Sequence, residues 1–365
     1  MFGGGRAWKI ASIGGIPVRV DSSWVFIAIF VVYSLVVQYT NNYGLRQSTA
    51  LPLALFTAVL FFGSILGHEL SHALVARLRN VEVSSITLYF FGGATATKLD
   101  KQPGDQFLIS AAGPGASLLI GAAFWFISRE TTGSLVTLSF GYVGWINLVL
   151  AAFNVIPGYP LDGGQMLRAA VWRVSGNETL ATKVATIGGF IVGGGLLGLG
   201  ALALYSGDVG GGLWIALIGW FLIQNAQGAR RRTALQSALK DATVQQAMGV
   251  PPAAIGAEMP LSQVLETYLR GHEHEAFPVV ENGHVAGLLT FDAASKVGQV
   301  NPFAPAREAM IPLAEVTTVA VDAPLQEALQ RLGGNGAALV LRDGELVGAL
   351  TAGDVQRWAN ANHVG

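Results

Sequence analysis

Long apolar runs separated by short polar segments dominate the first 229 residues. Six of these runs approach the roughly 20 residues that a helix needs to cross the hydrocarbon core of a bilayer. The fourth run is open to extension as far as residue 174, after a break at Pro157. A short polar segment with a β-like pattern, residues 1–20, precedes them. The six runs predict membrane-spanning helices over residues 22–40, 51–76, 106–128, 135–156, 184–205 and 211–227.

Residues 81–99, directly after the second run, depart from the helical pattern. They are rich in β-branched and aromatic residues, and Gly92-Gly93 is a turn signal. The pattern predicts a membrane-associated β segment, either a hairpin or a looped sheet, with an ordinary interfacial loop as the alternative. Its apolar character favours burial at membrane depth, which non-helical backbone tolerates only under a cover of protein or beside a cavity.

Two similar stretches, residues 276–290 and 337–351, follow in the more polar final third of the chain. Each reads as an apolar strand, a tight glycine turn, a second apolar strand and a helix start. Gly287 and Gly348 occupy equivalent places, which gives a repeat of 61 residues (348 − 287). The pattern predicts a tandem α/β module. The predicted domains are a membrane domain over 1–229, a linker over 230–242, and two repeats over 243–300 and 301–365.

Composition agrees with a membrane protein. Only 12% of the residues are charged and the mean hydropathy is +0.48. The net charge of −1 argues against a nucleic-acid partner. The chain has no cysteine, so disulfides and thiolate ligands are excluded and any zinc site must use histidine and carboxylate side chains.

The lysines and arginines predict the topology. If the N-terminus is cytoplasmic, the inner segments carry thirteen of them, including the triplet Arg230, Arg231 and Arg232, and the outer loops carry only Arg46 and Arg129. This asymmetry predicts a multi-pass protein of the cell membrane with its N-terminus and its C-terminal module in the cytoplasm. The first run is interpreted as a retained span, because no small-residue cleavage pattern follows it.

A metal-binding pattern lies in the second predicted span. His68 and His72 are four residues apart, so they share one helix face. This spacing suits two imidazoles on one Zn²⁺, with Glu69 beside them as a base for a water on the metal. A chance match is common in soluble helices, but polar residues inside a membrane span need a reason.

A second polar cluster, residues 154–168, interrupts the fourth run with prolines and glycines. Prolines and glycines that interrupt a helix at membrane depth usually line a cavity or a functional site. An Asp at the bilayer centre costs about 3 kcal/mol on insertion scales, and a zinc ion shared with His68 and His72 would offset that cost for Asp162. Asn154 is a candidate donor to a developing oxyanion. Alternatively, Asp162 is a helix N-cap and Asn154 an interhelical contact.

The two segments together resemble the site-2 protease family of intramembrane zinc metalloproteases. The resemblance rests on Gly67-His68-Glu69-Leu70-Ser71-His72 and on the stretch from Asn154 to Gly164. Within this family, the chain resembles in particular the prokaryotic branch that has six spans and a C-terminal pair of CBS domains. It implies regulated intramembrane proteolysis of a single-span protein, zinc on His68, His72 and Asp162, Glu69 as catalytic base, and Asn154 near the scissile bond. It also implies that residues 81–99 hold an unwound substrate segment. Gly113-Pro114-Gly115 is similar to the family too, whereas Ser117 stands where the family commonly has Asn, so no role is assigned to it.

The C-terminal repeat resembles paired CBS domains, which often bind adenine nucleotides. In the second copy the resemblance implies contacts of ATP or AMP with Thr351 and Asp354. In the first copy Asp292 stands one place early, so at most one good nucleotide site is expected. A nucleotide-free module that forms a homodimer is the alternative. His272, His274, His284 and His363 are interpreted as surface residues.

The sequence therefore predicts a polytopic α-helical membrane protein with a cytoplasmic α/β tandem CBS module. The leading hypothesis is an intramembrane zinc endopeptidase that acts on single-span substrates from the lipid bilayer. A CBS-regulated transporter or channel, with the intramembrane His, Glu and Asp residues as an ion path, is the alternative. A sensor that has lost activity is a third hypothesis, and the intact Glu69 counts against it.

Overall fold

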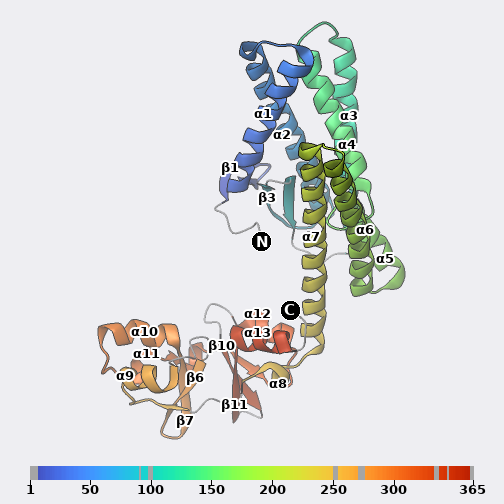
Figure 1. Ribbon diagram of the computed structural model, residues 1–365. Coiled ribbons are helices and arrows are strands. Elements are labelled where there is room, and N and C mark those ends of the chain that lie inside the picture. The colour runs from blue at the N-terminus through green and yellow to red at the C-terminus, as the bar shows by residue number, and fades with distance from the viewer. Residues whose placement is uncertain are drawn as a thin grey trace. The chain divides into compact units, whose positions relative to one another are not determined.

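A computed structural model describes residues 7–89, 92–97, 102–249, 254–269, 276–332, 337–342 and 345–361. The chain forms two compact units that divide between Arg230 and Arg231. The first unit consists of long helices and one small sheet, and the second mixes short helices and strands (Figure 1).

Within the described residues, six helices are long and apolar enough to cross a membrane. They are α1 (Ser22–Tyr43), α2 (Gln47–Leu78), α3 (Pro103–Glu130), α4 (Val136–Val155), α6 (Glu178–Tyr205) and α7 (Val209–Asp241). Each overlaps one of the six predicted runs, so the polytopic helical fold is confirmed. Large apolar side chains such as Phe26 and Leu119 lie exposed on the outward faces, as expected for helices that face lipid.

The fourth predicted run corresponds to α4, and its extension beyond the expected break at Pro157 is present as a separate helix. α4 stops at Val155, and a shorter helix, α5 (Asp162–Ser175), begins after an irregular segment. Pro157 and Pro160 lie in that segment. Proline lacks the N–H that a continuous helix needs, so the two prolines account for the break.

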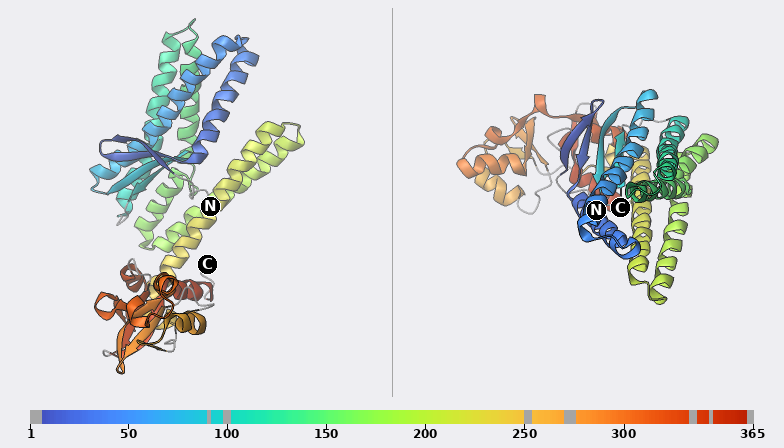
Figure 2. Two further views of the ribbon diagram at one scale, coloured as in Figure 1. Left: turned by 90° about the vertical axis from the view of Figure 1, so that its left-hand side faces the viewer. Right: turned by 90° about the horizontal axis from the view of Figure 1, so that it is seen from above.

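Four strands near one end of α1 and α2 form a small sheet (Figures 1 and 2). They are β1 (Trp8–Ile13), β2 (Ile16–Val20), β3 (Val83–Tyr89) and β4 (Gly92–Thr97), in the spatial order β1-β2-β3-β4. β2 and β3 are parallel, and the other two pairs are antiparallel. The hairpin predicted over 81–99 is thus present as β3 and β4. Gly92 and Gly93 belong to β4 and not to the turn, which lies outside the described residues.

Close approaches between helices depend on small residues. A Cβ on Gly144 of α4 would lie 2.8 Å from the backbone nitrogen of Trp125 in α3. Such contacts let helices pack tightly in lipid, where the hydrophobic effect does not drive them together. Buried hydroxyl groups add a second kind of contact: Thr57 of α2 donates to Ser139 of α4 (2.7 Å) and lies 2.8 Å from the hydroxyl of Tyr39 in α1.

The glycines of α6 face different neighbours. A Cβ on Gly189 would lie 2.0 Å from the carbonyl oxygen of Tyr159, in the segment between α4 and α5. A Cβ on Gly193 would lie 2.8 Å from the carbonyl oxygen of Gly219 in α7. Around Gly194 a Cβ would meet nothing within 4 Å. α6 therefore packs closely at some of its glycines and not at others, and Gly189 near its start contacts the segment that leads into α5.

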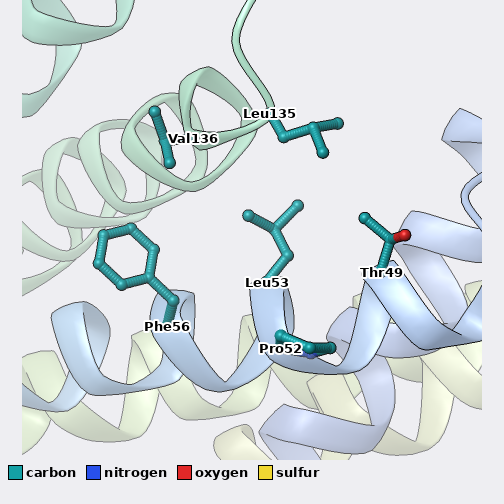
Figure 3. A pocket seen from close by; sticks show the side chains of 6 residues that line it. All are labelled: Thr49, Pro52, Leu53, Phe56, Leu135 and Val136. Carbon is teal, nitrogen blue, oxygen red and sulfur yellow. The ribbon is translucent and has the colours of Figure 1, made fainter.

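An apolar pocket of about 300 Å³ lies between the start of α2 and the start of α4 (Figure 3). Its lining residues are Thr49, Pro52, Leu53, Phe56, Leu135 and Val136. None of these side chains is titratable, so the pocket carries none of the chemistry predicted from the sequence.

The second unit contains two similar halves. The first half comprises α8 (Val244–Ala247), β5 (Ile255–Gly256), α9 (Leu261–Val264), a π-helical turn (Leu265–Leu269), β6 (Ala276–Glu281), β7 (His284–Thr290) and α10 (Phe291–Val300). The second comprises α11 (Ala306–Ala309), β8 (Ile311–Pro312), a 3₁₀ turn (Leu313–Glu315), β9 (Thr318–Ala320), α12 (Leu325–Arg331), β10 (Ala337–Arg342), β11 (Glu345–Thr351) and α13 (Ala352–Ala361).

The repeat of 61 residues is reproduced in the strand register. Val279 pairs with Gly287 in the first hairpin, and Val340 pairs with Gly348 in the second. Both hairpins have a register shift after these pairs. The segment that begins each half packs into the other half. Val244 and Ala247 at the start of the first half belong to the core of the second. Ala304, Ala306 and Ala309 at the start of the second half belong to the core of the first.

Candidate metal centre

Three predicted ligands come together in the first unit. His68 and His72 lie on α2, and Asp162 is the first residue of α5. His68 Nε2 lies 3.2 Å from Asp162 Oδ2, and His72 Nε2 lies 3.4 Å from Asp162 Oδ1. One ligand atom from each residue lies within 4.8 Å of the others, and both histidines are buried. The arrangement brings two imidazoles and one carboxylate to a single point.

The local sequence explains how Asp162 reaches α2. The backbone of α5 begins close against the end of α4, and glycines permit this approach. A Cβ on Gly163 would lie 2.2 Å from the carbonyl oxygen of Val155. The N-cap of α5 is Leu161, and Asp162 occupies the first helical position. The alternative interpretation of Asp162 as a simple N-cap is therefore wrong, and its carboxylate is free to point at the histidines.

The other nitrogen of each imidazole has a partner. His72 Nδ1 donates to the carbonyl oxygen of Ile109 (2.6 Å), and His68 Nδ1 lies 2.9 Å from Ser117 Oγ. A carbonyl only accepts hydrogen bonds, so it fixes the tautomer of neutral His72 with its Nε2 lone pair toward Asp162. Ser117, to which the sequence assigned no role, orients one of the two histidines. Metal-binding histidines commonly have such partners.

The two imidazole Nε2 atoms and the Asp162 carboxylate converge without a positive charge between them. The Nε2 atoms of His68 and His72 lie only 3.2 Å apart. Asp162 Oδ2 is buried and makes a short contact with His68 Nε2, but among the described residues it has no assigned hydrogen-bond partner. A buried oxygen left unpaired costs roughly 1–3 kcal/mol, more when charged. Lone pairs and a carboxylate that converge in this way fit Zn²⁺, which prefers three protein ligands at catalytic sites.

Gly113 of α3 keeps the space beside the ligands open. A Cβ at this position would lie 2.3 Å from His72 Nε2 and 2.4 Å from His68 Nε2. No side chain larger than hydrogen fits there without displacing the imidazoles. The donor set, the unpaired carboxylate oxygen and this open space all agree with a bound zinc ion.

Glu69 lies beside the histidines on α2 and is 7% exposed. Its Oε2 accepts a hydrogen bond from Thr95 Oγ1 of β4 (2.8 Å). Nothing in the sequence points to Thr95, because its position in a short strand of small and polar residues carries no signal for contact with α2.

Asn154 lies near the end of α4, where its Nδ2 donates to the carbonyl oxygen of Leu150 (3.1 Å). This bond lies within one helix. Asn147 of the same helix does make an interhelical contact, because its Nδ2 donates to Ser64 Oγ of α2 (2.9 Å). Asn147 had no assigned role in the sequence, and here it joins α4 to the helix of the two histidines.

The predicted nucleotide contacts lie where β11 meets α13 in the second unit. Asp354 Oδ2 accepts hydrogen bonds from the backbone nitrogen (2.8 Å) and the hydroxyl (2.6 Å) of Thr351, and Asp354 Oδ1 accepts one from Arg357 (2.6 Å). In the first half Ala293 takes the place of Asp354, 61 residues earlier. His284 is exposed, as expected. His272, His274 and His363 lie outside the described residues.

Comparisons with known proteins identify both units. The model of peptidase family M50 matches residues 56–137 and 129–194, and that of the CBS domain matches residues 244–296 and 306–360. The zinc metalloprotease Rip3 of Mycobacterium tuberculosis is 34% identical over 316 residues, 82% of this chain and 79% of that protein. A zinc metalloprotease of Methanocaldococcus jannaschii is 26% identical over 360 residues, 96% of this chain and 95% of that one.

Among solved structures, the site-2 protease of Methanocaldococcus jannaschii matches with 25% identity and a TM-score of 0.46, covering 62% of this chain and 95% of its own. The relatives are metalloproteases, so the transporter or channel alternative is not retained. The chain belongs to peptidase family M50, the site-2 proteases, as a zinc metalloprotease of the membrane that carries a tandem of CBS domains.

Proposed function

We propose that the chain is an intramembrane zinc endopeptidase that cleaves the transmembrane segment of single-span membrane proteins. The observation that carries the proposal is the meeting of His68, His72 and Asp162 ligand atoms within 4.8 Å. Two of these residues lie on a helix that is long and apolar enough to cross a bilayer. A water-dependent reaction at such a depth implies a substrate that also lies in the membrane.

His68, His72 and Asp162 are proposed to hold one zinc ion per chain. When bound, zinc polarises a peptide carbonyl and makes a water molecule more acidic. The Glu69 carboxylate accepts the proton of the attacking water and returns it to the leaving amine. The amide of Asn154 is proposed to donate to the carbonyl oxygen of the scissile bond, in exchange for its bond to the Leu150 carbonyl.

A helical substrate must unwind before a base can reach its peptide bond. Among the described strands, β4 is one of the two edges of the sheet and pairs with β3 alone. An exposed edge offers unpaired backbone groups that hold an extended peptide. We propose that the unwound segment adds to β4, next to the helix that carries Glu69.

The proposed orientation places the N-terminus and the CBS module in the cytoplasm, on the basis of thirteen inner against two outer lysines and arginines. The chain has no cysteine. The labelling of a single introduced cysteine therefore shows on which side of the membrane its loop lies, with no signal from native cysteines. A membrane-impermeant maleimide added to intact cells should label Thr132→Cys in an outer loop and not Ser175→Cys. The reverse pattern would overturn the orientation.

The CBS module is proposed to bind ATP or AMP at Thr351 and Asp354 and to form a homodimer. We propose that the ribose hydroxyls of the nucleotide replace Arg357 as the partner of Asp354 Oδ1. Calorimetry on the full chain should show one AMP site, lost in Asp354→Asn and kept in Asp292→Asn, an exposed control in the other half. Light scattering of the same samples reports the dimer. Equal AMP binding by both variants would reject this site.

Cleavage of a single-span reporter in proteoliposomes tests the main proposal. Glu69→Gln removes the base and keeps the shape, so turnover should fall roughly 10²- to 10⁴-fold. Glu130→Gln makes the same change at an exposed residue at the end of α3 and should leave turnover unchanged. Full activity of Glu69→Gln would reject Glu69 as the base.

A further inference from the structure

The hydroxyl of Thr95 joins strand β4 to the proposed base. Thr95 Oγ1 lies 2.8 Å from Glu69 Oε2 and 3.2 Å from the Glu69 carbonyl oxygen. Both oxygens accept, so the single hydroxyl proton is shared between the side chain and the backbone of Glu69. A hydrogen bond to a carboxylate is stronger than one between neutral groups, and it restricts rotation of the side chain.

Gly93 brings the same strand against the other side of Glu69. Gly93 and Thr95 are two residues apart and so lie on one face of β4. A Cβ on Gly93 would lie 2.4 Å from Glu69 Cγ and 2.8 Å from Glu69 Oε1. The carboxylate therefore lies against the strand, with Oε2 bonded to Thr95 and Oε1 beside the strand backbone.

The position of Thr95 is fixed by its cross-strand partner, whose side chain lies on the same face of the sheet. Thr95 pairs with Ile86 of β3, which is fully buried. Ile86 shares a hydrophobic cluster with Ile16 of β2 and Ala73 of α2. The sheet and the helix of the base are packed together, so the Thr95 hydroxyl and Glu69 keep a defined relation to each other.

We propose that Thr95 is a positioning residue that aligns the Glu69 carboxylate with a peptide held along β4. This inference rests on the proposed function, because it requires Glu69 to act as base and β4 to receive the substrate. One strand then has two roles: its edge fixes the peptide, and its inner face fixes the base. A rotated carboxylate would be misplaced with respect to the scissile bond even when the peptide and the zinc are bound.

A purely structural role for Thr95 makes different predictions. If the residue only fills space beside α2, Thr95→Val, which has nearly the same shape without the hydroxyl, would leave kcat unchanged. If the hydroxyl orients the base, Thr95→Val loses the hydrogen bond, and Thr95→Ser, which is smaller but keeps the hydroxyl, restores it. Thr87→Val is the matched control, because Thr87 lies on the adjacent strand β3 opposite Ala94.

The experiment measures kcat, KM and bound zinc for the full chain in proteoliposomes with a single-span reporter. In Thr95→Val we expect kcat to fall about 10- to 100-fold, the effect of losing one hydrogen bond to a charged group. KM and zinc content should stay near those of the unmodified chain. Thr95→Ser should recover most of kcat, and Thr87→Val should retain it.

An unchanged kcat in Thr95→Val would overturn the inference, as would an equally low kcat in Thr95→Ser or a loss of zinc in Thr95→Val. The unmodified chain and Glu69→Gln, measured in the same assay, separate this failure from that of the proposed function. If the unmodified chain cleaves, Glu69→Gln does not, and Thr95→Val equals the unmodified chain, only the role of Thr95 is wrong. If Glu69→Gln cleaves normally, both are wrong.

Discussion

His72 Nε2 lies 3.4 Å from Asp162 Oδ1, although one residue is in the interior of α2 and the other begins a separate short helix. The contact depends on the break between α4 and α5, because a continuous helix would carry Asp162 onward along the direction of α4. It also depends on the Ile109 carbonyl, which turns the Nε2 lone pair of His72 toward the carboxylate. The break before α5 and the Ile109 carbonyl thus both orient ligand atoms toward a position where a cation can bind.

Gly113 provides the most local test of that centre. In Gly113→Ala, the new methyl group would lie 2.3 Å from His72 Nε2, so at least one imidazole must move. We expect loss of bound zinc and of cleavage. Gly115→Ala is the matched control two residues away, where a Cβ would meet nothing within 4 Å. Zinc analysis of both purified variants checks the prediction, and normal zinc in Gly113→Ala would contradict it.

Ser117→Ala removes the partner of His68 Nδ1 without adding bulk. Loss of such an outer contact typically costs about 10- to 100-fold in metal affinity or activity. Competition with a zinc chelator should show this decrease. Ser128→Ala on the same helix, where the hydroxyl donates to the Trp125 carbonyl, should leave the affinity unchanged. Equal affinities in the two variants would mean that Ser117 does not orient His68.

Gly189→Ala tests whether α6, which carries no ligand, supports the site. The new methyl group would lie 2.0 Å from the Tyr159 carbonyl oxygen and would displace the segment that leads to Asp162. Overpacking of this kind costs roughly 1–3 kcal/mol, so the melting temperature and the zinc affinity should both fall. Gly194→Ala, which points into open space, should behave as the unmodified chain. A Gly189→Ala variant as stable as Gly194→Ala would refute this packing.

The sequence predicted the parts of the fold that depend on local patterns. Hydropathy alone located the six long helices, and helical spacing brought His68 and His72 to one face. Asp162 stood out because an ionisable residue in a broken apolar run needs a partner. Ser117 and Thr95 were not predictable, because each contributes a common hydroxyl through the packing of α3 or β4 on α2, and no local pattern specifies that packing. The same holds for the segments that begin each CBS half and pack into the other half, including Val244 and Ala306.

Lateral entry of substrate requires helices to separate, and α1, α6 and α7 are candidates because none of them carries a proposed ligand. Phe30 of α1 stacks on Trp214 of α7 with ring centroids 5.5 Å apart. Cysteines at both positions, joined by a reducible crosslinker in a chain that otherwise lacks cysteine, should block cleavage of a membrane reporter. Reduction should restore cleavage, and the uncrosslinked double variant is the control. Unchanged turnover in the crosslinked protein would reject this entry route.

The central claim is that His68, His72 and Asp162 bind the catalytic zinc of an intramembrane protease. Its most direct test is the zinc content of purified full-length protein, measured by mass spectrometry on the same preparations that are assayed for reporter cleavage. We predict about one zinc per chain in the unmodified protein and in Glu69→Gln, very little in Asp162→Asn, and cleavage by the unmodified protein alone. A folded Asp162→Asn variant that keeps its zinc and its activity would contradict the account.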